Sequence, residues 1–425
     1  MIGKGKVDSI LKYQAIGFDM DHTFIRYRLK DFIKHISEST AVFLVNHRGY
    51  SQEIFPLNEE EAISSYKMFF RAVFDHRTGF LLKIGSSMTI MRAFHGFDRV
   101  SDAELLRTYG DPPTLEDYTV LAHRHRDFTN MHEFYSAALS PLIAKIVHLR
   151  KHGNPRLVKK SFYEITRDLN DAAEFNFAIR DFSVFETRLY PGYFFPKFIS
   201  QPKRYINPVS REFLQRLKAL KDRGVITFIA SNSYYHMGKV LLRNAIGLDW
   251  PDYFSFVIFD TKKPAFFDTL IKTPPPFTNL EGKPVDIAEV VRETSKDPSK
   301  DKKAKVMLGG HVSLIHKFLF DSKNKNFQAA FFGDTIATDC ALAFDKQMSR
   351  YWDIIFILEE LQELETGMPE DEYFDSVKNW GSSLHDRHIS IGGIEKTTIF
   401  NFADSDAQRT FSKLDAPDCL DFFDI

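Results

Sequence analysis

The stretch Ala15-Ile16-Gly17-Phe18-Asp19-Met20-Asp21-His22-Thr23 places two aspartates directly after a short apolar run. The apolar part predicts a buried strand. If the strand continues, Asp19 and Asp21 share one face, because successive side chains of a strand point to opposite faces. If the strand ends at Asp19, a tight turn can bring both carboxylates around one phosphate group and one metal ion. Buried carboxylates are costly unless a cation or a reaction requires them, so we expect chemistry here.

The composition limits the class of protein. The chain has 425 residues, of which 44% are hydrophobic and 27% charged, as in ordinary globular proteins. This length predicts two domains plus additional segments. A net charge of −1 gives no reason to expect a nucleic-acid partner. The two cysteines, Cys340 and Cys419, cannot build a disulfide scaffold or a cysteine zinc site. Because Met1–Lys12 lacks the apolar core of a signal peptide and no run has bilayer-spanning length, we expect a cytoplasmic protein with no membrane contact.

Four later apolar segments are predicted strands, and each is followed by polar or charged residues. These segments and the residues that follow them are Val225–Ala230 with Ser231 and Asn232, Tyr253–Phe259 with Lys263, Phe327–Phe332 with Asp334 and Asp339, and Ile354–Leu358 with an acidic run. Helical patterns separate the strands, which predicts an α/β fold with a parallel sheet whose faces are covered. Ligands bind beyond the carboxyl ends of such strands, so these side chains can converge.

A more charged, helical pattern occupies the middle of the chain. Its clearest predicted helices are 130–150 and 161–178. We therefore expect a discontinuous core formed by 1–100 and 188–365, an inserted helical cap at 101–187, and a C-terminal extension with an acidic tail at 366–425. The segments 80–84 and 88–91 predict a β-hairpin, which falls within the first piece of this core.

The residue types at the strand ends are those that phosphoryl transfer requires. A carboxylate nucleophile can attack phosphorus to give an aspartyl phosphate, which splits one difficult displacement into two easier ones. A second carboxylate can protonate the leaving alcohol and then activate water. Two anions repel an anionic phosphate unless a cation such as Mg²⁺ neutralises them. A lysine and a hydroxyl group complete the binding of the phosphoryl oxygens.

Four motifs, in order, resemble those of the haloacid dehalogenase (HAD) superfamily. They are DMDHT at 19–23, SNS at 231–233, Lys263 in KKP, and GDTIATD at 333–339. The segments GFDMDHT, FLLKIGSSMTIMRAFHG and TKKPAFF further resemble the cytosolic purine (IMP/GMP-preferring) 5′-nucleotidases. The resemblance implies a HAD-like Rossmannoid core, with three layers around a parallel sheet, and an inserted, mainly helical cap. It also implies a nucleoside monophosphate substrate and, because relatives assemble as dimers or tetramers, a homo-oligomer.

The same resemblance implies a role for each core residue. Asp19 would be the nucleophile, Asp21 the general acid and base, and Lys263 would stabilise the phosphoryl charge. Mg²⁺ would be held by Asp19, the backbone carbonyl of Asp21 and Asp334, with Asp339 outside the direct ligands. An alternative for Asp339 is a cap of the following helix, since aspartate favours such positions.

Phosphate binding and base recognition are further implied roles. Ser231, where the family usually has threonine, would bind phosphate together with the backbone amide of Asn232. Arg167 and Asp171 fit an Arg-x-x-x-Asp pair that recognises the purine base, and Asn130 matches a base-site asparagine. The alternatives are a solvated helical ion pair for Arg167–Asp171 and a helix cap for Asn130.

Three hypotheses for function follow. The first is a Mg²⁺-dependent 5′-nucleotidase. The second is a phosphatase for another small phosphorylated metabolite, because residues near the base-site positions depart from the purine pattern. The third is a low-activity family member that acts through partner binding. The complete set of acidic and basic residues at the strand ends argues against this third hypothesis.

Overall fold

The computed structural model describes residues 12–55, 72–84, 88–115, 126–131, 134–179, 183–295, 304–322, 326–334, 336–339 and 348–356. These residues form two compact units. The first contains the described residues of 12–27 and 206–356, and the second contains those of 28–205. The expected C-terminal extension at 366–425 lies outside the described residues.

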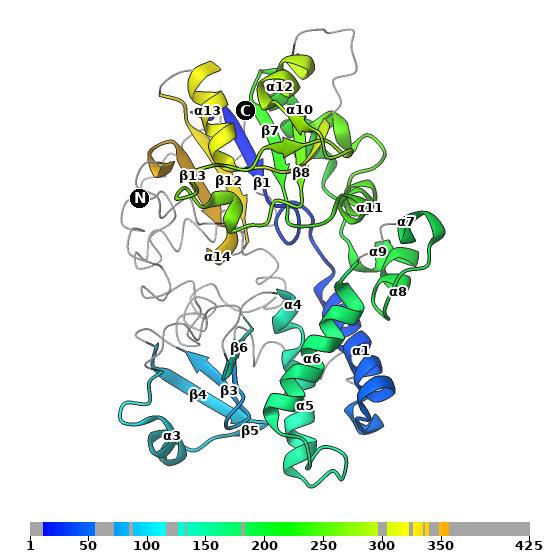
Figure 1. Cartoon of the computed structure of the whole chain (residues 1–425), viewed down its shortest axis with the longest axis vertical. Helices are drawn as coiled ribbons and strands as arrows, with labels where there is room; N and C mark the ends of the chain where they lie inside the picture. Colours follow the sequence, from blue (N-terminus) through cyan, green and yellow to red (C-terminus); the bar gives the residue numbers. More distant parts are fainter. Residues whose placement is uncertain are drawn as a thin grey trace, which may run out of the picture. The chain divides into compact units, whose positions relative to one another are not determined.

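An eight-stranded sheet forms the centre of the first unit (Figure 1). Its order is β10-β9-β11-β8-β7-β1-β12-β13, so β1 lies between β7 and β12. Neighbouring strands from β11 to β13 are parallel, and β9 and β10 add an antiparallel edge. The strands are β1 (Ala15–Phe18), β7 (Ile226–Ala230), β8 (Phe256–Phe259), β9 (Phe277–Thr278), β10 (Pro284–Val285), β11 (Lys305–Gly309), β12 (Ala329–Gly333) and β13 (Trp352–Phe356).

Helices cover both faces of this sheet. By strand register, Phe18 and Trp352 point to opposite faces. The ring of Phe18 contacts Phe213 of α10 with centroids 6.4 Å apart, whereas Trp352 Nε1 donates to His316 Nδ1 of α13 at 3.4 Å. The helices of this unit are α10 (Arg211–Asp222), α11 (Tyr235–Ala245), α12 (Ile287–Ser295), α13 (Val312–Ser322) and α14 (Ile336–Asp339).

The α/β class and the five predicted core strands are confirmed. Every residue of β1, β7, β8 and β12 is buried, as expected of parallel strands that are covered on both faces. The sheet is mixed rather than wholly parallel because of the edge formed by β9 and β10. Strand β11 was not predicted, because it begins at the exposed Lys305, at the end of the lysine-rich stretch 296–305 of the sequence.

The second unit contains a five-stranded antiparallel sheet of order β5-β4-β3-β2-β6 and a group of helices. Phe74 and Leu81 from the sheet share a buried cluster with Leu44 of α1, Ile143 of α5 and Ile165 of α6. The strands are β2 (Val73–Asp75), β3 (Phe80–Ile84), β4 (Ile90–His95), β5 (Asp98–Arg99) and β6 (Phe128–Asn130). The helices are α1 (Leu29–Arg48), α3 (Asp102–Tyr109), α4 (Phe134–Ala137), α5 (Ser140–Lys151), α6 (Phe162–Phe177), α7 (Val184–Thr187), α8 (Phe195–Ser200) and α9 (Pro202–Tyr205).

This unit differs from the mainly helical insertion expected at 101–187. Its described residues begin at 28, and the predicted hairpin of β3 and β4 belongs to its sheet. The reason is that β2 pairs both with β3 and with β6, which lies after position 101. The predicted helix 161–178 is confirmed as α6, which starts with a capping box between Ser161 and Glu164. The predicted helix 130–150 is wrong in its first part, because Asn130 ends β6.

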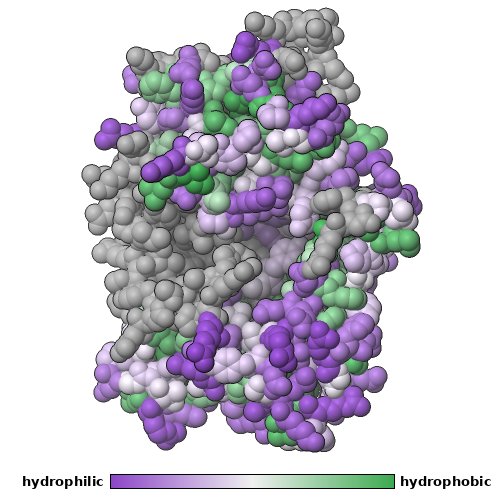
Figure 2. Space-filling view, viewed as in Figure 1, coloured by the Kyte–Doolittle hydropathy of each residue, from purple (hydrophilic) through white to green (hydrophobic). Residues whose placement is uncertain are grey.

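The surface of the described residues is mixed in polarity. On the face drawn in Figure 2, hydrophobic side chains are interspersed among hydrophilic ones. The most exposed large hydrophobic side chains, Leu189, Leu248 and Leu270, belong to separate parts of the sequence. Among the described helices, none combines the length and the apolar character needed to cross a bilayer.

We expect Gly17→Ala to lower the free energy of unfolding by about 1–3 kcal/mol, as overpacking of a dense core does. A Cβ atom at Gly17 would lie 2.3 Å from Phe228 Cζ and 2.7 Å from Phe331 Cδ2, both on neighbouring strands. Urea unfolding followed by circular dichroism measures the change. Adding Phe228→Leu should recover part of the loss by removing the closest atoms. Equal stability of Gly17→Ala and the unsubstituted protein would contradict this packing.

Candidate active site

The carboxyl ends of four neighbouring parallel strands, β8, β7, β1 and β12, carry the polar residues that the sequence indicated. The backbone N–H of Asp19 donates to the carbonyl of Phe332 at 2.7 Å, and that of Ser231 donates to Ile258 at 2.9 Å. The strand ladders therefore fix the first residue after β1 and the first residue after β7. The expected convergence of these strand ends is confirmed.

A tight turn follows Asp19, so the strand ends there and does not continue to Asp21. Strand β1 ends at Phe18, and the N–H of Ile25 closes the turn on the carbonyl of Met20 at 2.8 Å. His22 has a φ of 58°, in the left-handed region that a tight turn often requires. The turn also brings Thr23 Oγ1 to the end of β12, where it donates to Asp334 Oδ1 at 3.2 Å.

A cluster of buried charges lies at these strand ends. Lys263 Nζ is 2.6 Å from Asp19 Oδ1 and 2.5 Å from Asp339 Oδ1. Oxygen atoms of Asp19, Asp334 and Asp339 lie within 4.8 Å of one another. All four side chains are buried, so water screens their charges only weakly. The cluster combines three carboxyl groups with one ammonium group.

The pKa values of this cluster are shifted by burial and by mutual interaction. Burial raises the pKa of Asp19, and the nearby Lys263 ammonium opposes this rise. Burial raises the pKa of Asp334 well above its usual range, and the carboxylates of Asp339 and Asp19 raise it further. For Lys263, burial alone would lower the pKa, but Asp19 and Asp339 together raise it above its ordinary value. The lysine therefore stays charged, while Asp19 and Asp334 favour uptake of a proton or a cation.

The donor set fits a Mg²⁺ ion. Mg²⁺ takes oxygen ligands and is usually held by one or two carboxylates together with phosphate and water. Asp19, Asp334 and Asp339 place such oxygens within 4.8 Å of one another. A single lysine does not neutralise three ionised carboxylates, so a further cation can bind. Asp339 was expected outside the direct ligands. In the structure its carboxylate both contacts Lys263 and lies in this oxygen group.

Asn232 holds the loop that carries Lys263. Its Oδ1 accepts hydrogen bonds from the backbone N–H of Lys263 at 2.6 Å and from Thr261 Oγ1 at 2.9 Å. Its Nδ2 donates to the carbonyl of Lys263 at 3.0 Å. Ser231 is buried beside it, and its Oγ accepts from the N–H of Ser233 at 3.0 Å, which leaves the hydroxyl hydrogen able to donate. The side chain of Asn232 thus orients Lys263, a role that the sequence did not reveal.

Asp21 is held by two hydroxyl groups. Tyr27 donates to its Oδ1 at 2.5 Å, and Ser233 Oγ donates to its Oδ2 at 2.7 Å. Both partners were missed from the sequence. Ser233 lies within the Ser-Asn-Ser stretch after β7, which offered a signal, whereas no motif marked Tyr27. The two hydroxyls fix the carboxyl plane of Asp21 beside the cluster.

The residues expected to recognise a base all lie in the second unit. Asn130 is the last residue of β6, so it does not cap a helix. Arg167 and Asp171 both lie in α6, but Asp171 forms its ion pair with Arg48 of α1 at 2.8 Å. Arg48 Nε also lies 3.4 Å from Asp168. Helix packing within the unit therefore accounts for Asp171 without an Arg167–Asp171 pair.

Comparison with known proteins identifies the family. The human protein named 5′-nucleotidase domain-containing protein 1 is 26% identical over 418 residues, which cover 93% of this chain and 86% of that protein. The bovine protein of the same name is 25% identical over 406 residues, which cover 91% of this chain and 84% of that protein. Residues 9–408 match the 5′ nucleotidase family, which spans almost the whole sequence. The chain belongs to the 5′ nucleotidase family.

Proposed function

We propose that this chain cleaves nucleoside 5′-monophosphates to nucleoside and phosphate, with Mg²⁺ as cofactor and an aspartyl phosphate on Asp19 as intermediate. As a member of the 5′ nucleotidase family, the chain is a phosphoric monoester hydrolase. The finer proposal rests chiefly on one observation, the contact of Asp19 with Lys263 next to two further buried carboxyl groups. A HAD-like core, in which the nucleophile follows the central strand β1, is part of the proposal.

In the first step, a carboxylate oxygen of Asp19 attacks phosphorus while the bond between phosphorus and the 5′ oxygen breaks. Asp21 gives its proton to that oxygen, so the nucleoside leaves as a neutral alcohol. The Lys263 ammonium lies 2.6 Å from Asp19 and stabilises the charge on the transferring phosphoryl group. The Ser231 hydroxyl and the backbone amide of Asn232 supply further donors.

In the second step, water attacks phosphorus and the bond to Asp19 breaks, which releases phosphate and restores the carboxylate. Asp21 takes the proton from the water, so the two steps leave its protonation unchanged. Its hydrogen bonds from Tyr27 and Ser233 keep the same carboxyl group in position for both transfers. Positioning of this kind removes part of the entropic cost of each step.

Mg²⁺ bound by Asp19, the backbone carbonyl of Asp21 and Asp334 would supply positive charge that offsets the repulsion between these carboxylates and the phosphate. Asp339 holds Lys263 through the 2.5 Å ion pair, which keeps the ammonium group next to Asp19. In this mechanism Asp19 attacks phosphorus, Asp21 transfers the protons, and Lys263 neutralises charge.

A second candidate is a phosphatase for another small phosphorylated metabolite. One observation favours it: the Asp171 carboxylate, which was expected to help recognise a purine base, is engaged by Arg48 at 2.8 Å. The two candidates share the mechanism at Asp19 and differ only in the group that leaves. A third alternative is slow turnover with a role in partner binding, and little or no phosphate release from any compound in the same experiment would indicate it.

Phosphate release from a panel of nucleoside monophosphates and sugar phosphates with Mg²⁺ distinguishes these candidates. We expect nucleoside 5′-monophosphates to be the preferred substrates, and Asp19→Asn to reduce release to background because the amide is not a nucleophile. Asp222→Asn, an exposed aspartate at the end of α10, is the matched control. Preference for sugar phosphates would favour the second candidate. Release that persists in Asp19→Asn, or no release from any compound, would reject Asp19-based catalysis.

Mg²⁺ should stabilise the protein more at high pH than at low pH. Burial raises the pKa of Asp334 above its usual value, so its contribution to stability is present below about pH 4 and is lost as the pH rises through the raised pKa. Mg²⁺ binds the ionised carboxylates, and it therefore offsets this loss of stability most strongly at pH 8. The difference in Tm between Mg²⁺ and EDTA, measured at about pH 5 and pH 8, tests this.

In that experiment Asp334→Asn should abolish both the effect of Mg²⁺ and its dependence on pH, because the variant lacks the carboxylate. Asp222→Asn should behave as the unsubstituted protein does. An undiminished effect of Mg²⁺ in Asp334→Asn would show that the metal does not bind at the strand ends.

Tyr27→Phe and Ser233→Ala should each lower kcat by about 10-fold with little change in KM. A hydrogen bond to a charged group contributes roughly 1.5–3 kcal/mol, and about 1.4 kcal/mol corresponds to a tenfold change in rate. Steady-state kinetics measures the effect. Tyr253→Phe is the control, since it removes a comparable bond to Asp249 at 3.0 Å in the same unit. A rise in KM alone, or equal effects of Tyr27→Phe and Tyr253→Phe, would argue against positioning of Asp21.

A further inference from the structure

The tip of the hairpin formed by β4 and β5 packs directly on the last turns of α5. Gly96, in the turn of this hairpin, has a φ of +69°, and a Cβ atom there would lie 2.8 Å from the Cα of His148. The ring of Phe97 contacts the His148 ring with centroids 5.4 Å apart. The two backbones therefore approach closely, and the first residue of β5, Asp98, comes to the end of the helix.

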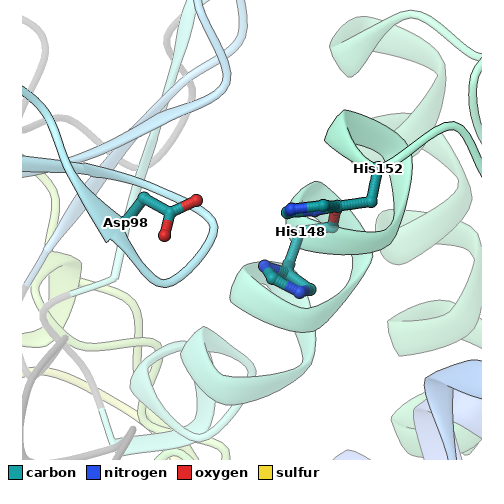
Figure 3. A group of neighbouring side chains, drawn as sticks. All are labelled: Asp98, His148 and His152. Atoms are coloured by element: carbon teal, nitrogen blue, oxygen red, sulfur yellow. The ribbon is translucent and has the colours of Figure 1, made fainter.

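Two histidines, four residues apart, lie at this end of α5. His148 is in the last turns and His152 is the C-cap residue, so both lie on the same side of the helix. Their ring centroids are 4.1 Å apart. Figure 3 shows the Asp98 carboxylate facing the two imidazole rings from the hairpin. Ligand atoms of Asp98, His148 and His152 lie within 4.8 Å of one another.

The hydrogen bonds leave imidazole nitrogens available as ligands. His152 Nδ1 lies 2.8 Å from the carbonyl oxygen of His148, and because a carbonyl only accepts, this nitrogen carries the proton. In the neutral ring, His152 Nε2 then has the lone pair. Metal-binding histidines commonly donate their other nitrogen to a backbone carbonyl in this way. His148 Nδ1 is buried and has no hydrogen-bond partner among the described residues, a state that calls for an explanation.

We propose that Asp98, His148 and His152 form a binding site for a divalent transition-metal ion, with Zn²⁺ as the preferred ion. Two imidazoles and one carboxylate are a common ligand set for Zn²⁺, whereas Mg²⁺ takes oxygen ligands. Ligand atoms lie about 3.3 Å apart around a tetrahedral ion, so small side-chain rotations from the present separation suffice. The helix C-terminus carries partial negative charge, which also favours a cation.

Lys151 competes with a metal ion for this site. Its Nζ lies 2.9 Å from Asp98 Oδ2, and both side chains are substantially exposed. An exposed ion pair of this kind contributes at most about 1 kcal/mol, so a metal ion can displace the lysine. A bound ion would link the hairpin to α5 through three side chains and leave a fourth position for water. It would therefore stabilise the second unit.

Isothermal titration calorimetry of the full chain with Zn²⁺, in excess Mg²⁺ to occupy oxygen sites, tests the proposal. We expect one Zn²⁺ site whose Kd rises by roughly 10-fold or more in His152→Gln and in Asp98→Asn. Both residues are exposed, so neither substitution should impair folding. Lys151→Gln should lower Kd by about two- to fivefold, because the competing ion pair is lost. His47→Gln, an exposed histidine of α1, is the control and should leave Kd unchanged.

Co²⁺ in place of Zn²⁺ provides a spectroscopic signature. Visible absorption of a four-coordinate, nitrogen-ligated Co²⁺ should be present in the unsubstituted protein and lost in His152→Gln. No Zn²⁺ site in the unsubstituted protein would overturn the proposal. So would a site that both His152→Gln and Asp98→Asn retain, or one that His47→Gln weakens to the same extent.

Discussion

The strand-end site depends on the ammonium group of Lys263, which is buried between the carboxylates of Asp19 and Asp339 at 2.6 and 2.5 Å. A buried pair costs desolvation on both sides, and loss of one partner leaves an uncompensated charge in the interior, at a cost of roughly 3–5 kcal/mol. Such an arrangement is weak evidence for stability. When ionised, the third carboxyl group, Asp334, would make the excess of negative charge larger still, and its pKa is raised accordingly. An excess of buried negative charge is better explained by the binding of a cation and an anionic substrate than by a contribution to folding stability.

The sheet assembles this cluster from distant parts of the chain. Because β1 lies between β7 and β12, with β8 beyond β7, the residues after four strands meet at one edge. The hydrogen bonds of Asn232 then hold the loop of Lys263 against the end of β7. Tyr27 and Ser233 hold Asp21 in the same way. Backbone register thus places the charges, and hydroxyl and amide side chains fix their orientation.

Much of this could be predicted from the sequence, because continuous apolar runs ending in polar residues mark buried parallel strands. The order of the strands in the sheet was beyond such patterns, since it depends on pairings between distant segments. Strand β11 was missed because Lys305 continues a lysine-rich segment. Asn130 was assigned to a helix, whereas pairing with β2 holds it in a strand. The partner of Asp171 is Arg48, more than a hundred residues away, and helical spacing cannot reveal such a pair.

We propose above all that Asp19 is transiently phosphorylated. The most direct test is to mix the protein with Mg²⁺ and a nucleoside 5′-monophosphate, quench in acid, reduce with borohydride, and locate the modified residue by mass spectrometry. Borohydride reduces an acyl phosphate to the alcohol, so we predict homoserine at position 19 and nowhere else, and only when the nucleotide is present. Phosphate release accompanied by an unmodified Asp19, or by modification at another carboxylate, would contradict it.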